Sequence, residues 1–144
     1  MRILIGGASG LIGGALVPRL AERGHEVARL VRDRGDGGDR CDGGDGGDRG
    51  GGGGADRAGT IPWDPDRGLL DPDRLRGVDA VVHLGGVGIA SGRWTTARKQ
   101  AILESRVRST LLLAERIASA PSTDRPRAFV VASATGFYGH RGEE

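Results

Sequence analysis

The chain has 144 residues, enough for one domain with a buried core. Its net charge is only +2, and its basic residues, all but one of them arginine, are not interleaved with aromatic side chains, so we expect no nucleic-acid partner. The lone Cys41 allows neither an internal disulfide nor a cysteine-ligated metal site, and with no signal peptide and no membrane-length apolar run we expect a cytoplasmic protein with no membrane partner.

The first strand is expected at residues 1–5, a short aliphatic run typical of a strand that is buried on both faces. A glycine-rich segment follows, in which Gly7, Gly10 and Gly13 have the spacing G-x-x-G-x-x-G. Glycines permit a tight turn and a close approach of the backbone to a pyrophosphate, whose charge is favoured at a helix start. The segment predicts a dinucleotide-binding turn in which Leu11 and Ile12 also contact the cofactor.

A helix and a second strand complete this unit, which we assign to residues 1–33. Gly24 is expected to end the helix, and residues 25–31 form the second strand. Apolar residues at helical spacing support the helix: Ile12, Ala15, Leu16 and Leu20. The alternative is a glycine turn that only packs a helix on a sheet, and the complete strand–turn–helix context argues against it.

Arg32 ends the second strand, at the position where a carboxylate would hydrogen-bond the ribose of NAD. A guanidinium there suits the 2′-phosphate of NADP, although the adjacent Asp33 leaves the choice open. The alternative role for Arg32 is that of an ordinary solvated arginine. We expect NADP or NAD as the cofactor, with NADP favoured.

Residues 34–59 consist almost wholly of glycine, aspartate and arginine. Because no large aliphatic side chain is available for burial, we expect a disordered insertion where a second helix would otherwise stand. Residues 43–50 resemble a calcium-binding nonapeptide repeat. That repeat needs a large apolar residue where Gly50 stands, and no second copy follows, so calcium binding is not expected.

Residues 60–144 form the remainder of the predicted nucleotide-binding domain. A short strand and a structured loop are expected in residues 60–72, and a buried strand begins at residue 79. This strand ends in Leu84, Gly85 and Gly86, and the two glycines, which have no side chain, leave room for a ligand across the sheet. His83 has no partner at metal-ligand spacing, so we interpret it as a core histidine.

A long helix capped by Thr95 or Thr96 comes next, followed by a buried strand at residues 128–132. The helix carries apolar or small side chains at helical spacing: Leu103, Val107, Thr110, Leu111, Ala114 and Ile117. Alternating strands and helices predict an α/β fold with a Rossmann-like, doubly wound parallel sheet. Ligands of such sheets bind beyond the carboxyl ends of the strands, where residues 7–13, 85–86 and 133–138 would converge.

Several segments together resemble the extended short-chain dehydrogenase/reductase superfamily, and within it the atypical NAD-dependent epimerase/dehydratase family of the YfcH type. The segments that carry this likeness are residues 6–13, 63–65, 78–86, 89–95, 104–106 and 133–139. Proteins of that family are about twice as long. The resemblance therefore implies the N-terminal portion of a cofactor-binding domain, truncated before its later strands and substrate lobe.

The resemblance also implies that Ser133 or Thr135 polarises a carbonyl or alcohol of an unknown small-molecule substrate. The alternative for each is a strand-end hydroxyl that satisfies backbone groups. Tyr138 could line the nicotinamide pocket, while Ser105 and Arg106 would tether the long helix to a loop.

Three functional hypotheses remain. The chain could be the NAD(P)-binding portion of an epimerase-like oxidoreductase, a non-catalytic NAD(P)-binding or regulatory protein, or a truncated product without independent activity. We expect the chain alone to be catalytically inert.

Overall fold

A parallel sheet forms the centre of the computed structural model, which describes residues 1–33, 59–89 and 92–133. Within these residues, five strands pair in the order β3-β2-β1-β4-β5, and every pairing is parallel. The strands are β1 (Arg2–Gly6), β2 (Glu26–Arg32), β3 (Thr60–Trp63), β4 (Ala80–His83) and β5 (Ala128–Val131). This order and direction establish the predicted α/β, Rossmann-like fold.

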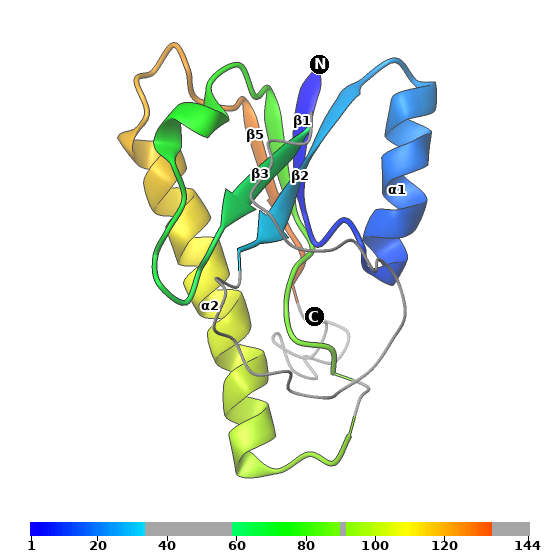
Figure 1. The fold of residues 1–144 in the computed structure, drawn as a ribbon, viewed down its shortest axis with the longest axis vertical. Helices are drawn as coiled ribbons and strands as arrows, with labels where there is room; N and C mark the ends of the chain where they lie inside the picture. Colours follow the sequence, from blue (N-terminus) through cyan, green and yellow to red (C-terminus); the bar gives the residue numbers. More distant parts are fainter. Residues whose placement is uncertain (34–58, 90–91, 134–144) are drawn as a thin grey trace, which may run out of the picture.

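Helices cover both faces of the sheet (Figure 1). Helix α1 (Leu11–Glu22) packs on one face, where Val17 contacts a cluster that contains Ile3 and Ile5. Helix α2 (Thr96–Ser119) and the short 3₁₀ helix η2 (Pro72–Leu75) pack on the other. Because strand side chains alternate between faces, Leu4 joins the α2-side core while its two neighbours join the α1 side.

The predicted helix boundaries agree with the structure. Thr95 is the N-cap of α2, and its hydroxyl oxygen accepts a hydrogen bond from the Arg98 amide at 3.1 Å, which decides between the two expected caps. Gly24 ends α1 with a φ of +79°, a conformation that glycine adopts without strain. No helix in the described part of the chain is long and apolar enough to cross a membrane.

The buried face of α2 differs from the apolar stripe seen in the sequence. Leu112 and Leu113 are buried, together with the small polar residues Ser105 and Ser109. Leu103, Val107 and Leu111 instead lie on the exposed side of the helix. The N-terminal part of α2 extends past the carboxyl ends of the strands (Figure 1), so it has less sheet to cover. Ser109 forms a hydrogen bond with His83 of β4, and Ser105 forms one with Val87 in the loop that follows β4.

The predicted insertion at 34–59 lies outside the described residues except for Gly59. The carbonyl oxygen of Gly59 accepts a hydrogen bond from the Arg29 amide at 2.7 Å, immediately before β3 begins.

Candidate functional site

The predicted cofactor-binding segments meet at the carboxyl edge of the sheet (Figure 1). Gly6 at the end of β1 pairs with Leu30 of β2 on one side and with His83 of β4 on the other. The glycine turn, Arg32 and residues 84–86 therefore lie at three adjacent strand ends, those of β1, β2 and β4. This is the edge at which open α/β sheets bind ligands.

The glycine turn leads directly into α1. Gly7 has a φ of +81°, and its carbonyl oxygen accepts a hydrogen bond from the Gly10 amide at 3.1 Å. Gly10 is the N-cap of the helix, where it provides no side-chain hydrogen bond, and the first turn carries no acidic residue. The helix start thus presents backbone N–H groups and the positive end of its dipole at the sheet edge.

The three motif glycines are required for different reasons. A Cβ atom on Gly7 would lie 2.7 Å from the Gly85 amide nitrogen, and one on Gly13 would overlap the carbonyl oxygen of Gly7. These two glycines are needed by the packing of the chain itself. The nearest atom to a Cβ on Gly10 is 3.4 Å away, and both Gly10 and the following Leu11 and Ile12 are exposed. Packing among the described residues therefore does not explain the glycine at position 10.

The loop after β4 is held by α2. The Val87 amide donates to the Ser105 hydroxyl oxygen at 3.0 Å, and the Arg106 guanidinium donates to the Val87 carbonyl oxygen at 3.1 Å. The Arg98 guanidinium donates to the Gly88 carbonyl oxygen at 2.7 Å. These bonds confirm the predicted tether of Ser105 and Arg106, and they fix the backbone beside Gly85 and Gly86.

His83 is a core histidine, as predicted, with 2% of its surface exposed. Its Nε2 lies 2.8 Å from the Ser109 hydroxyl oxygen, and that hydroxyl donates its own proton to the Ser105 carbonyl oxygen at 2.6 Å. Nε2 therefore carries the proton, and Nδ1, which has no partner among the described residues, is the acceptor. Burial, and secondarily the charge of Arg32, lower the pKa of His83, so the imidazole is neutral.

Arg32 points to the α2 side of the sheet, the side on which Leu30 is buried. Its guanidinium lies 3.5 Å from the Asp66 carboxylate, which is also 3.9 Å from the guanidinium of Arg108 on α2. The neighbouring Asp33 donates its amide to the Trp63 carbonyl oxygen at 2.9 Å. Sequence reasoning missed Asp66 and Arg108, because only the folded chain brings them to the end of β2.

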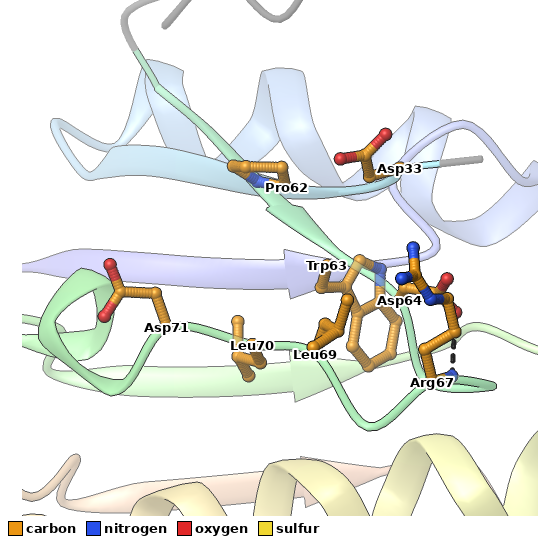
Figure 2. A pocket seen from close by; sticks show the side chains of 8 residues that line it. All are labelled: Asp33, Pro62, Trp63, Asp64, Arg67, Leu69, Leu70 and Asp71. Carbon is orange, nitrogen blue, oxygen red and sulfur yellow. Dashed lines mark hydrogen bonds between the residues drawn. The ribbon is translucent and has the colours of Figure 1, made fainter. Parts of the chain in front are cut away.

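A cavity of about 130 Å³ lies between β3 and the turn that follows it. Figure 2 shows Trp63 and Leu70 on one side of the strand and Asp33 and Pro62 on the other. The Asp64 carboxylate shapes the turn by accepting the amides of Asp66 and Arg67 at 2.9 and 3.1 Å. Ligand pockets usually measure roughly 300–1,000 Å³, so this cavity alone is too small for a dinucleotide.

Ser133 is exposed just beyond β5, at the same sheet edge. The preceding Ala132 amide donates to the His83 carbonyl oxygen at 3.0 Å, which continues the β4–β5 ladder toward the site. Thr135 and Tyr138 lie outside the described residues, so of the two expected catalytic hydroxyls the structure describes only that of Ser133.

Comparison with known proteins adds independent information. The model of the NAD dependent epimerase/dehydratase family matches residues 3–144. The chain is 35% identical over 138 residues to Epimerase family protein Mb2239 of Mycobacterium bovis, and 32% identical over 140 residues to Epimerase family protein SDR39U1 of Homo sapiens. Each alignment covers 96% of this chain and 38% of the relative. The chain thus spans little more than a third of the length of these relatives.

Solved structures show the same partial coverage. The crystal structure of human epimerase family protein SDR39U1 (isoform 2) with NADPH is similar with a TM-score of 0.66 and 32% identity, over 96% of this chain and 38% of that one. MoeE5 in complex with UDP-glucose and NAD is similar with a TM-score of 0.60 and 24% identity, over 96% of this chain and 38% of that one. The second likeness supports the fold alone.

Proposed function

Because the chain belongs to the NAD dependent epimerase/dehydratase family, we propose that it is the cofactor-binding portion of an epimerase- or dehydratase-like oxidoreductase. The glycine turn after β1 would hold the pyrophosphate of NADPH or NADH. The observation that carries the proposal is Gly10, a glycine at an exposed helix start that no contact within the described chain requires. A close backbone approach by a pyrophosphate supplies the missing reason.

The other expected residues fit this placement. Backbone amides of Leu11, Ile12 and Gly13 begin α1 and would face the pyrophosphate, while Leu84, Gly85 and Gly86 leave space across the end of β4. Arg32 would lie beside the adenosine ribose. A structural relative, human SDR39U1, is described with NADPH, which supports a nicotinamide dinucleotide here.

Catalysis is assigned to the complete protein rather than to this chain alone. The bound nicotinamide would supply hydride transfer, and Ser133 or Thr135 would orient a carbonyl or alcohol of the substrate by hydrogen bonding. The chain alone is proposed to bind cofactor without turning over substrate, because it covers only 38% of its relatives.

The proposal is tested by titrating NADPH and NADH into the purified chain and into Gly10→Val. The variant should keep its thermal unfolding transition within a few degrees, because a side chain at position 10 has room, yet lose binding of both cofactors. Gly14→Ala is the matched control, since an added Cβ there meets no atom within 4 Å, and its binding should be unchanged. Absence of cofactor binding by the unmodified, folded chain would contradict the proposal.

A second measurement separates an oxidoreductase from a non-catalytic cofactor-binding protein. A full-length relative carrying this segment should consume NADPH in the presence of substrate. Binding without turnover in the full-length protein would favour the non-catalytic alternative.

A further inference from the structure

We propose that Arg108 on α2 is a second binding group for the 2′-phosphate of NADP(H), beside the expected Arg32, and that Asp66 competes with this phosphate for the two guanidinium groups. The inference rests on the proposed dinucleotide binding at the glycine turn. It concerns how the chain distinguishes NADPH from NADH, and it assigns this discrimination to three side chains.

These side chains come from separate elements and meet at one point. Arg32 is the last residue of β2, Asp66 belongs to the turn after β3, and Arg108 lies in the middle of α2. The Asp66 carboxylate is 3.5 Å from the guanidinium of Arg32 and 3.9 Å from that of Arg108. Two guanidinium groups therefore lie close to the same carboxylate, that of Asp66.

The location fits the adenosine end of the proposed cofactor. Leu30 is paired with Gly6, and Arg32 is two residues farther along β2, beside the start of the glycine turn. In dinucleotide-binding sheets the ribose 2′ position lies at the end of the second strand. A 2′-phosphate at that position would be attracted electrostatically by the guanidinium groups of both arginines.

The ion pairs to Asp66 are of a kind that a phosphate can replace. Both are long and partly exposed, and such pairs contribute little to stability. A phosphate carries up to two charges and offers several acceptor oxygens to a planar guanidinium. Arg108 is also held at 2.9 Å by Glu104, one turn earlier on α2, so its position does not depend on Asp66 alone.

Asp66 is itself held in place by the local backbone. Its amide donates to the Asp64 carboxylate at 2.9 Å, in the turn that brings the chain back to Leu69. The backbone of Asp66 is thus held by the turn, and its carboxylate reaches both arginines. With NADH bound, Asp66 would keep both ion pairs, whereas NADPH would have to displace it.

The test measures dissociation constants for NADPH and NADH with the unmodified chain, Asp66→Asn and Arg108→Gln. Asp66→Asn should tighten NADPH binding several-fold, while Arg108→Gln should weaken it roughly tenfold, as expected for loss of a charge-assisted hydrogen bond. NADH binding should change less than about twofold in both variants, since it has no 2′-phosphate. Adenosine 2′,5′-bisphosphate, used as a competitor, should follow the NADPH pattern, and AMP the NADH pattern.

Arg23→Gln is the control for a general loss of positive charge, because Arg23 caps the C-terminal end of α1, whereas the glycine turn lies at its N-terminal end. It should leave the NADPH-to-NADH affinity ratio unchanged. Arg108→Lys, which keeps the charge, should restore part of the loss and provides a second variant if Arg108→Gln unfolds.

The outcomes separate the two proposals. If the unmodified chain binds neither cofactor, the proposed function fails. If it binds both, and the affinity ratio is the same in Asp66→Asn and Arg108→Gln as in the unmodified chain, dinucleotide binding stands and the 2′-phosphate site is wrong. A ratio that changes only in Arg108→Gln would overturn the competing role of Asp66.

Discussion

Gly7 and Gly85 approach so closely that a Cβ atom on Gly7 would lie 2.7 Å from the amide nitrogen of Gly85. The same atom would lie 2.8 Å from the carbonyl carbon of Leu84. The turn after β1 and the loop after β4 are therefore packed backbone against backbone. Their contact places two segments of the candidate site in a fixed relation.

This contact predicts a large stability loss for Gly7→Ala. Alanine would bear the strain of a φ of +81° and would also clash with backbone atoms that cannot rotate away. Gly24→Ala is the matched control, because Gly24 has a φ of +79° but no atom within 4 Å of an added Cβ. Urea denaturation should show a loss of about 1–2 kcal/mol for Gly24→Ala and a clearly larger loss for Gly7→Ala. Equal losses would mean that the two loops are not in contact.

The assignment of the buried face of α2 is tested by two leucines on the same helix. Leu113 is fully buried, whereas Leu111 is 54% exposed. Leu113→Ala should lower the free energy of unfolding by about 2–5 kcal/mol through lost burial and a cavity. Leu111→Ala should change it by less than about 0.5 kcal/mol. The reverse order in chemical denaturation would show that α2 is rotated about its axis.

Ser105→Ala should loosen the loop after β4 by leaving the Val87 amide without the hydroxyl oxygen that accepts its proton. Hydrogen exchange of the Val87 amide, followed by NMR, should accelerate by roughly tenfold. Ser119→Ala serves as the control, since the Ser119 hydroxyl donates to the Arg116 carbonyl oxygen of its own helix at 3.0 Å. If Val87 exchanges at the same rate in both variants, the hydroxyl does not hold the loop.

His83 predicts a pH-dependent loss of stability on the acidic side of neutrality. Burial and, to a lesser extent, Arg32 lower the pKa of the folded imidazole, while in the unfolded chain its pKa is about 6.5. Below that value the unfolded state binds a proton that the native state resists, so the free energy of unfolding falls as pH decreases. The free energy of unfolding that depends on neutral His83 is fully present above about pH 7. Below pH 6.5 it declines by up to about 1.4 kcal/mol per pH unit.

The measurement compares urea unfolding of the unmodified chain and His83→Gln at pH 7.5, 6.5 and 5.5. Glutamine retains a hydrogen-bond donor for Ser109 but does not titrate, so its stability should depend less on pH over this interval. Parallel curves for the two proteins would assign the acid sensitivity to other groups.

Most strands and helix ends could be predicted from the sequence, because the residues that determine them are close together in the chain. The aliphatic run of β1, the glycine turn and the Thr95 cap each carry their own signal. The buried face of α2 could not be predicted in this way, because Ser109 is buried by its bond to His83 rather than by an apolar side chain. Tertiary hydrogen bonding therefore overrode the hydrophobic period of this helix.

The candidate site was also only partly predictable from the sequence. Gly7, Gly10 and Gly13 were identifiable from spacing, whereas the convergence of Arg32, Asp66 and Arg108 requires the fold of the turn after β3. Charged residues are frequent in this chain, and nothing in their spacing marks those three as neighbours. Predictions for residues 34–58 and for Thr135 lie outside the described residues and remain predictions.

The contact of Gly7 with Gly85 also determines when the candidate site forms during folding. It joins the ends of β1 and β4, two strands that are adjacent in the sheet but distant in sequence, and the Leu84 amide reinforces it by donating to the Gly6 carbonyl oxygen at 2.8 Å. A peptide comprising only β1, α1 and β2 would contain the complete glycine motif but would lack this support. The proposed dinucleotide affinity should therefore appear only once β4 has docked beside β1, and the glycine motif alone should not confer it on another protein.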